Sequence, residues 1–165
     1  MLQIDFLEAI LKECKKNGVH TAVDTAGHMP FECFEQIIPY TDLFLYDIKC
    51  FDNEKHKKYV GVENELILEN ARKIAESGAD LTIRVPVIPT FNNTPDEIRD
   101  IAKFVKTLPN VKNMHLLPYH RMGEDKYKGL GREYLLENIT PPTDEKMNEL
   151  LKVAEGYGLK AKIGG

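Results

Sequence analysis

The chain has 165 residues, 42% of them hydrophobic and 29% charged, and its 22 basic and 26 acidic side chains give a formal net charge of -4. This composition is typical of one soluble globular domain spanning residues 1–165, and the mild acidic excess argues against a nucleic-acid partner. The chain has neither a basic start followed by an apolar run nor the roughly 18 consecutive apolar residues of a membrane span. We therefore expect a cytoplasmic protein with no membrane partner.

Apolar residues recur at helical and strand spacings in alternation along the chain. Helices are expected over residues 7–14, 31–38, 52–59, 67–75, 94–105 and 147–154, and strands over 20–23, 43–46, 81–88, 111–117 and 159–163. The polar stretch 120–138 is expected to be a long, mobile loop that serves as a lid or docking surface.

Several local signals set the ends of these elements. Gly18 stops the first helix, the second must end before Pro39, and Asp52 can cap the third. The clearest start is at Thr94, where Pro95 occupies the first helical position and Glu97 is expected to complete a capping box. In the third strand Pro86 and Pro89 should prevent ordinary central-strand hydrogen bonding along its whole length.

Strands that alternate with helices across short connections predict a parallel sheet, either in a barrel or in an open doubly wound fold. The turn at residues 24–27 is not the glycine-rich turn of a doubly wound nucleotide binder. A complete eight-stranded barrel needs about 250 residues, so the chain is too short for one.

Each expected strand brings an ionisable residue to, or near, the end where a barrel builds its active site. The first strand ends in Asp24-Thr25, the second in Asp47-Ile48-Lys49, the third contains Arg84, and the fourth runs into His120. Each of them has a plain structural role available, but four in succession favour a site. Two acids with Lys, Arg and His suit a small zwitterionic ligand.

The remaining cysteines and histidines are interpreted as structural. The spacing of Cys14, Cys33 and Cys50 fits no zinc or iron–sulfur motif, and reduced, half-buried thiols are expected. His115 falls in the middle of the fourth strand and is interpreted as a core or sheet-face residue. No role is assigned to the other histidines, His20, His28 and His56.

Five spaced motifs resemble the radical S-adenosylmethionine activases of glycyl radical enzymes, with the pyruvate formate-lyase activating enzymes as the nearest group. They are HTAVDTAG at 20–27, LYDIK at 45–49, IRVPVIP at 83–89, LLPYH at 116–120 and LKAKIGG at 159–165. The resemblance implies an α/β fold, a partial TIM-like radical SAM barrel. About four βα units of a six-unit (β/α)6 barrel and a short C-terminal strand would be present.

The resemblance also implies a site. Asp24, Asp47 and Lys49 would surround the amino and carboxylate groups of S-adenosylmethionine, and Arg84 and His120 would complete the pocket. A monovalent cation would lie near Asp24, Thr25, Leu45 and Asp47. The partner would be a glycyl radical enzyme such as pyruvate formate-lyase, contacted near residues 121–134, and flavodoxin or ferredoxin would donate electrons to the intact enzyme.

The chain departs from the family in two ways that matter. It lacks the Cys-x3-Cys-x2-Cys motif that holds a 4Fe-4S cluster and the Gly-Gly-Glu-Pro motif that in the family precedes residues very like Leu2-Gln3. We therefore expect the C-terminal part of an activase, inactive alone. In the intact enzyme, reductive cleavage of S-adenosylmethionine yields a 5′-deoxyadenosyl radical that abstracts hydrogen from a glycine. A smaller departure is Thr90, where the family commonly has glycine.

Two alternatives stay open. A Schiff-base lyase would use Lys49 as its nucleophile, with His120 or Asp47 carrying protons. A cluster-free binding module would instead dock a partner through the loop after His120. An unclosed sheet edge should also promote self-association.

Overall fold

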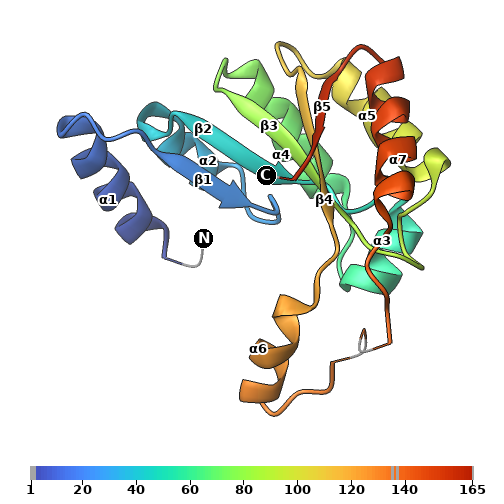
Figure 1. Ribbon diagram of the computed structural model, residues 1–165. Helices are drawn as coiled ribbons and strands as arrows, with labels where there is room; N and C mark the ends of the chain where they lie inside the picture. Colours follow the sequence, from blue (N-terminus) through green and yellow to red (C-terminus); the bar gives the residue numbers. More distant parts are fainter. Residues whose placement is uncertain (1–2, 135, 137, 165) are drawn as a thin grey trace.

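The computed structural model describes residues 3–134, 136 and 138–164, and Figure 1 shows the course of the chain. The helices are α1 (Ile4–Lys16), α2 (Glu32–Ile37), α3 (Asn53–Val60), α4 (Glu65–Glu76), α5 (Pro95–Thr107), α6 (Glu124–Gly129) and α7 (Asp144–Gly156). Two 3-10 turns are η1 (Ile38–Tyr40) and η2 (Arg121–Gly123). The strands are β1 (Ala22–Thr25), β2 (Leu43–Asp47), β3 (Leu81–Val87), β4 (Asn113–Pro118) and β5 (Lys160–Ile163).

All five strands are parallel, and their order in the sheet is their order in the chain. A doubly wound sheet reverses its strand order and so carries helices on both faces. Here the order never reverses, and right-handed crossovers place successive helices on one face. The expected α/β architecture with part of a barrel wall is confirmed.

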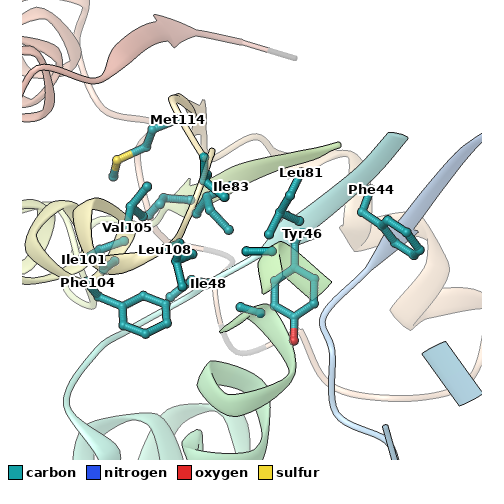
Figure 2. Packing of buried hydrophobic residues seen from close by; sticks show 14 of the residues in the cluster. Phe44, Tyr46, Ile48, Leu81, Ile83, Ile101, Phe104, Val105, Leu108 and Met114 are labelled. Carbon is teal, nitrogen blue, oxygen red and sulfur yellow. The ribbon is translucent and has the colours of Figure 1, made fainter. Parts of the chain in front are cut away.

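The helix-covered face of the sheet holds the hydrophobic core, part of which Figure 2 shows. Alternate strand residues such as Phe44, Tyr46, Ile83 and Met114 are fully buried there against helical residues such as Ile101. Each such side chain contributes about 1.5–3 kcal/mol relative to exposure. The opposite face carries the intervening strand residues, which are half-buried or exposed apart from the buried Thr82, so most of the concave side of the wall is open.

Every expected helix and strand is present, with small shifts at the ends. The first strand begins two residues later than expected, because Thr21 is held by side-chain hydrogen bonds to the carbonyl of Tyr40 and the carboxylate of Asp42. The α-helical part of the second helix ends at Ile37, before Pro39 as predicted, and the chain continues as η1.

Two local expectations were wrong in part. Thr94 caps α5 by accepting from the Glu97 amide, but among the described contacts the Glu97 carboxylate does not accept from the Thr94 amide, so the capping box is incomplete. The Glu97 carboxylate instead pairs with Lys55 and accepts from the Cys50 thiol. The stretch after His120 is not a plain loop, because it begins with η2 and α6, which project away from the sheet (Figure 1).

Prolines were expected to prevent ordinary hydrogen bonding along the whole third strand, and the second half of β3 confirms this. β3 is central, lying between β2 and β4, but its register with β2 stops at Arg84 while that with β4 continues to Val87. Pro86 therefore lies where only one neighbouring strand remains. A residue without an amide hydrogen fits a central strand at such a place.

Thr90 adopts a positive backbone φ of 72° and is exposed. A β-branched residue is strained in this left-handed region, whereas glycine is not. We expect Thr90→Gly to raise the free energy of unfolding by about 0.5–1 kcal/mol, after the larger unfolded-state entropy of glycine is deducted. Urea unfolding measures the change. Asn110→Gly, also at positive φ (63°), is the control and should gain less because asparagine tolerates this conformation; a loss of stability in Thr90→Gly would contradict the account.

Among the described residues, no helix is long and apolar enough to cross a membrane.

Candidate ligand-binding site at the strand ends

Three of the expected site residues form one ion-pair cluster, in which Asp24 and Asp47 lie at or next to the carboxyl ends of β1 and β2 and Arg84 lies in the middle of β3. The Arg84 guanidinium donates from Nε and Nη2 to Asp47 Oδ1, at 3.0 and 2.9 Å, and from Nη2 to Asp24 Oδ1 at 2.5 Å. Register explains the first contact, since Asp47 and Arg84 are paired residues on neighbouring strands. The side chains of Arg84 and Asp47 are only 13% and 19% exposed, whereas Asp24 is 61% exposed.

Burial and charge act against each other in this cluster. Burial raises the pKa of the Asp47 carboxyl above its usual range, and hydrogen bonds and charge from Arg84 oppose that rise. Burial also lowers the pKa of the Arg84 guanidinium, but its bonds to both carboxylates outweigh this and the net direction is upward. Arg84 is therefore a fixed positive charge between two acids.

The turn after β1 shapes the rim of the cluster. Thr25 Oγ1 accepts a hydrogen bond from the Gly27 amide at 3.1 Å, and Gly27 has a positive φ of 73°. The buried Asn70 side chain donates to the carbonyls of Gly27 and Met29 at 2.8 and 2.7 Å. The turn that carries Thr25 is thus fixed at both ends.

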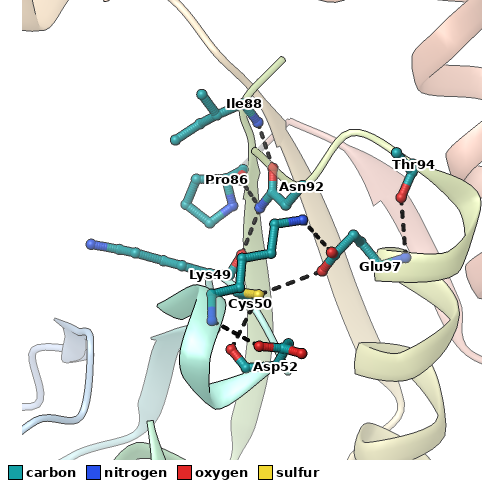
Figure 3. A network of polar contacts seen from close by, with 9 residues as sticks. Lys49, Cys50, Asp52, Pro86, Ile88, Asn92, Thr94 and Glu97 are labelled. Carbon is teal, nitrogen blue, oxygen red and sulfur yellow. Dashed lines mark hydrogen bonds and ion pairs between the residues drawn. The ribbon is translucent and has the colours of Figure 1, made fainter. Parts of the chain in front are cut away.

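Lys49 lies beside the cluster in a pocket of about 470 Å³. Asp47, Pro86 and Ile88 also line it, together with the aromatic residues Tyr59, Phe91 and Tyr127. In Figure 3 the Lys49 side chain points away from the polar network behind it. Asp24, Asp47, Lys49 and Arg84 together are called the mouth below. Their formal charges cancel, and they offer both anionic and cationic groups to a zwitterion.

His120 is placed near the mouth but not in the cluster. It is exposed, follows β4, and caps η2 by accepting from the Met122 amide at Nδ1, 3.3 Å away. No hydrogen bond joins it to Asp24, Asp47 or Arg84 within the described part of the chain.

The four residues expected to hold a monovalent cation are close in the sheet. Asp24 and Leu45 are register partners, and Thr25 follows Asp24. Asp24 and Asp47 both accept hydrogen bonds from Arg84. Arg84 already supplies positive charge between the two carboxylates. In the described ranges no three His, Cys, Asp or Glu side chains are grouped as metal ligands, and the cation stays a prediction.

Two further concave-face residues were missed by sequence reasoning. Register places His115 beside Arg84 and Lys162 beside His115, so a row of ionisable side chains runs across β2 to β5 from Asp47. Burial lowers the pKa of His115, and the charges of Lys162 and Arg84 add to this. The prediction that His115 lies in the core or on a sheet face agrees with this position. Alternate residues of a strand share one face, so aligning the strands and asking which residues share the face of Arg84 would have found the row.

The cysteines do not fit an iron–sulfur cluster. Cys14 and Cys33 lie half-buried on α1 and α2, and Cys50 is buried in the β2–α3 loop. Burial and the nearby Glu97 carboxylate raise the pKa of the Cys50 thiol to about 12, so it is protonated rather than a thiolate ligand.

Similarity to known proteins is extensive. The profile of the radical SAM superfamily matches residues 1–105. Over 164 residues the chain is 38% identical to the trans-4-hydroxy-L-proline dehydratase activating enzyme of Clostridioides difficile, covering 98% of this chain and 54% of the relative. It is 39% identical over 164 residues to a pyruvate formate-lyase-activating enzyme of Staphylococcus epidermidis, covering 96% and 65%. The chain thus spans about half to two thirds of these curated relatives.

Solved structures agree. A crystal structure of a domain of pyruvate-formate lyase-activating enzyme from Bacteroides vulgatus matches with a TM-score of 0.81 at 33% identity, covering 99% of this chain and 92% of that one. Streptococcus suis SuiB matches with a TM-score of 0.72 at 12% identity, covering 96% of this chain and 36% of that one, and so shares the fold.

Proposed function

The chain belongs to the radical SAM superfamily, and on that basis we propose that it is the S-adenosylmethionine-binding part of a glycyl radical enzyme activase. The observation that carries the proposal is the charge-balanced mouth formed by Asp24, Asp47, Lys49 and Arg84. Relatives at 35–42% identity are activating enzymes for a dehydratase, a lyase, a sulfolyase and a decarboxylase, which supports the activase class.

In this proposal the cluster recognises the amino-acid end of S-adenosylmethionine. Asp24 and Asp47 accept hydrogen bonds from the ammonium group, and Lys49 and Arg84 face the carboxylate. Arg84 also opposes the rise that burial causes in the pKa of the half-buried Asp47 carboxyl. The bound molecule would supply the 5′-deoxyadenosyl group for hydrogen abstraction from a partner's glycine.

Three further parts complete the proposal. His120 lies at the rim, where rotation about its side chain would bring it to the ligand. A monovalent cation beside Asp24, Thr25, Leu45 and Asp47 would screen the carboxylates. A flavodoxin or ferredoxin would be the electron donor of an activase that holds the cluster. No observation favours a Schiff base on Lys49.

Isothermal titration of the purified chain with S-adenosylmethionine tests the proposal. We expect one site per chain, and S-adenosylhomocysteine, which keeps the same amino-acid end, should compete for it. Absence of heat and of any competition at millimolar ligand would refute the proposed function.

The chain alone is expected not to assemble a 4Fe-4S cluster, because the described residues contain no grouped thiolate ligands. Anaerobic treatment with iron and sulfide, followed by desalting, should leave no broad visible absorbance and no bound iron. A full-length relative such as the Staphylococcus epidermidis enzyme is the positive control. One cluster per chain would show that this interpretation of the cysteines is wrong.

A docking role for η2, α6 and the following Leu130 is a second part of the proposed function. Met122 and Leu130 are 77% and 69% exposed, and Tyr127 is 43% exposed. Figure 1 shows this segment projecting from the sheet after the carboxyl end of β4. Exposed apolar side chains on a projection are typical of an interaction surface, and we propose that the glycyl radical enzyme docks here.

A Met122→Glu variant is therefore expected to weaken binding to a cognate glycyl radical enzyme by about tenfold or more, as loss of a buried apolar contact requires. Surface plasmon resonance with purified glycyl radical enzymes of the classes above measures it. Ile10→Glu, on the exposed part of α1 at 47%, is the matched control and should not change the affinity. Equal loss in both variants would place the surface elsewhere.

A further inference from the structure

The buried side chain of Asn92 joins the ends of two strands that carry the candidate site. Its Nδ2 group donates to the carbonyls of Lys49 and Pro86 at 2.6 and 2.7 Å, and its Oδ1 accepts from the Ile88 amide at 2.7 Å. The residue is 0% exposed. Figure 3 shows the amide lying between the β2 end and the β3 end. Three short hydrogen bonds thus satisfy one buried amide.

The need for this link arises from Pro86. The Ile48 amide donates to the Arg84 carbonyl at 2.9 Å, so the next bond in that ladder would come from the residue two further along β3. That residue is Pro86, which has no amide hydrogen. The ladder between β2 and β3 therefore stops directly before Lys49, and the Asn92 amide occupies the gap.

A second contact from the same segment reaches the β2–α3 loop. Glu97, in the first turn of α5, forms an ion pair with Lys55 and lies 3.5 Å from the Cys50 thiol. The thiol is also 3.5 Å from the Asp52 carbonyl. The start of α5 thus holds the residues after Lys49 from one side, while Asn92 holds Lys49 itself.

Two other buried asparagines bind carbonyl pairs in a different way. Asn64 donates to Cys50 and Phe51, which are adjacent residues of one loop. Asn70 donates to Gly27 and Met29, again within one loop. Asn92 differs because its two carbonyls belong to separate segments of the sheet: Lys49 lies two residues after Asp47, and Pro86 lies two residues after Arg84.

We propose that Asn92 is a positioning residue for ligand binding. It fixes the spacing between the end of β2, where Asp47 is followed by Lys49, and the second half of β3, which directly follows Arg84. Its effect on S-adenosylmethionine rests on the proposed function. Without it, no backbone hydrogen bond in the described part of the chain joins these segments of β2 and β3 past the one from the Ile48 amide. The contacts from Arg84 to Asp47 would then hold the spacing alone, and Lys49 would lose its fixed position relative to them.

The experiment compares Asn92→Ala and Asn92→Asp with a core control. The aspartate keeps the shape and the acceptor for the Ile88 amide but removes both donors, so it remains informative if the alanine variant does not fold. Ile101→Ala, fully buried on α5, lowers stability without touching the strand ends. Titration calorimetry gives the dissociation constant of S-adenosylmethionine, and NMR follows the Lys49 carbonyl carbon and the Arg84 Nε–H resonance.

Both Asn92 variants are expected to weaken binding by about tenfold or more, whereas Ile101→Ala should stay within about twofold of the wild type. Equal affinity in the Asn92 variants, or equal loss in Ile101→Ala, overturns the inference. If the wild type itself binds no S-adenosylmethionine, the proposed function fails. In that case the NMR signals still test the positioning role of Asn92. Shifts at Lys49 and Arg84 that occur in the Asn92 variants but not in Ile101→Ala support it, and unchanged signals refute it.

Discussion

Gly27→Ala is expected to lower the free energy of unfolding by roughly 3 kcal/mol or more, the sum of a left-handed backbone penalty and a severe overlap. Gly27 has a φ of 73°, and an added Cβ would lie 1.7 Å from Tyr46 Oη and 2.2 Å from its Cζ. Tyr46 cannot move aside easily, because it is fully buried and donates to the Ile67 carbonyl at 2.7 Å.

Thermal unfolding followed by circular dichroism measures this effect, and a loss of about 3 kcal/mol corresponds to a fall in Tm on the order of 10 °C for a chain of this size. Gly78→Ala is the matched control. Gly78 also has a positive φ, 82°, but nothing lies within 4 Å of its added Cβ, so only the backbone penalty remains. If the two variants lose the same stability, the contact between Gly27 and Tyr46 does not constrain the turn.

Arg84→Gln is expected to weaken S-adenosylmethionine binding by about tenfold or more and to cost about 1–3 kcal/mol of stability. The substitution leaves the half-buried Asp47 without its guanidinium partner. It also removes the positive charge that lies between the carboxylates of Asp47 and Asp24. Titration calorimetry and urea unfolding measure the two effects. Arg99→Gln, an arginine paired with Asp96 on the surface of α5, is the control and should change neither.

The same variant predicts a pH effect with a definite sign. Burial raises the pKa of Asp47 and Arg84 opposes the rise, so removing Arg84 should raise that pKa further. A carboxyl whose pKa is higher in the folded than in the unfolded state favours folding only while protonated. Relative to wild type, Arg84→Gln should therefore lose stability as pH rises from about 4, the unfolded pKa, through the raised value. A difference independent of pH would contradict the coupling.

The sequence predicted what depends on local pattern. Apolar spacing located the elements of the sheet and its helices, and the position of charged residues in or near the ends of successive strands predicted the cluster of Asp24, Asp47 and Arg84. These succeeded because parallel strands bring their carboxyl ends to one edge whatever the details of packing. His120 was expected in the same cluster but caps η2, since its nearest available donor is a backbone amide two residues away.

Long-range polar contacts could not be predicted in this way. Glu97 has the spacing of a capping box, yet its carboxylate pairs with Lys55, which is 42 residues away in sequence. Asn92 gave no periodic signal, because its role depends on Pro86 ending a ladder between two strands. A proline inside an expected central strand was the clue, and the buried amide that compensates for it becomes visible only when the strands are placed together.

The most direct test of the account is to follow S-adenosylmethionine binding by NMR on the isotopically labelled chain. We predict saturable shifts at Asp24, Asp47, Lys49 and Arg84, at the concave mouth of the sheet. A second hollow of about 690 Å³ lies among α2 and α4, lined by Phe31, Glu32, Glu35, Ile38, Lys73, Glu76 and Ser77. Shifts confined to that hollow, or no shifts at saturating ligand, would contradict the assignment of the strand-end cluster as the binding site.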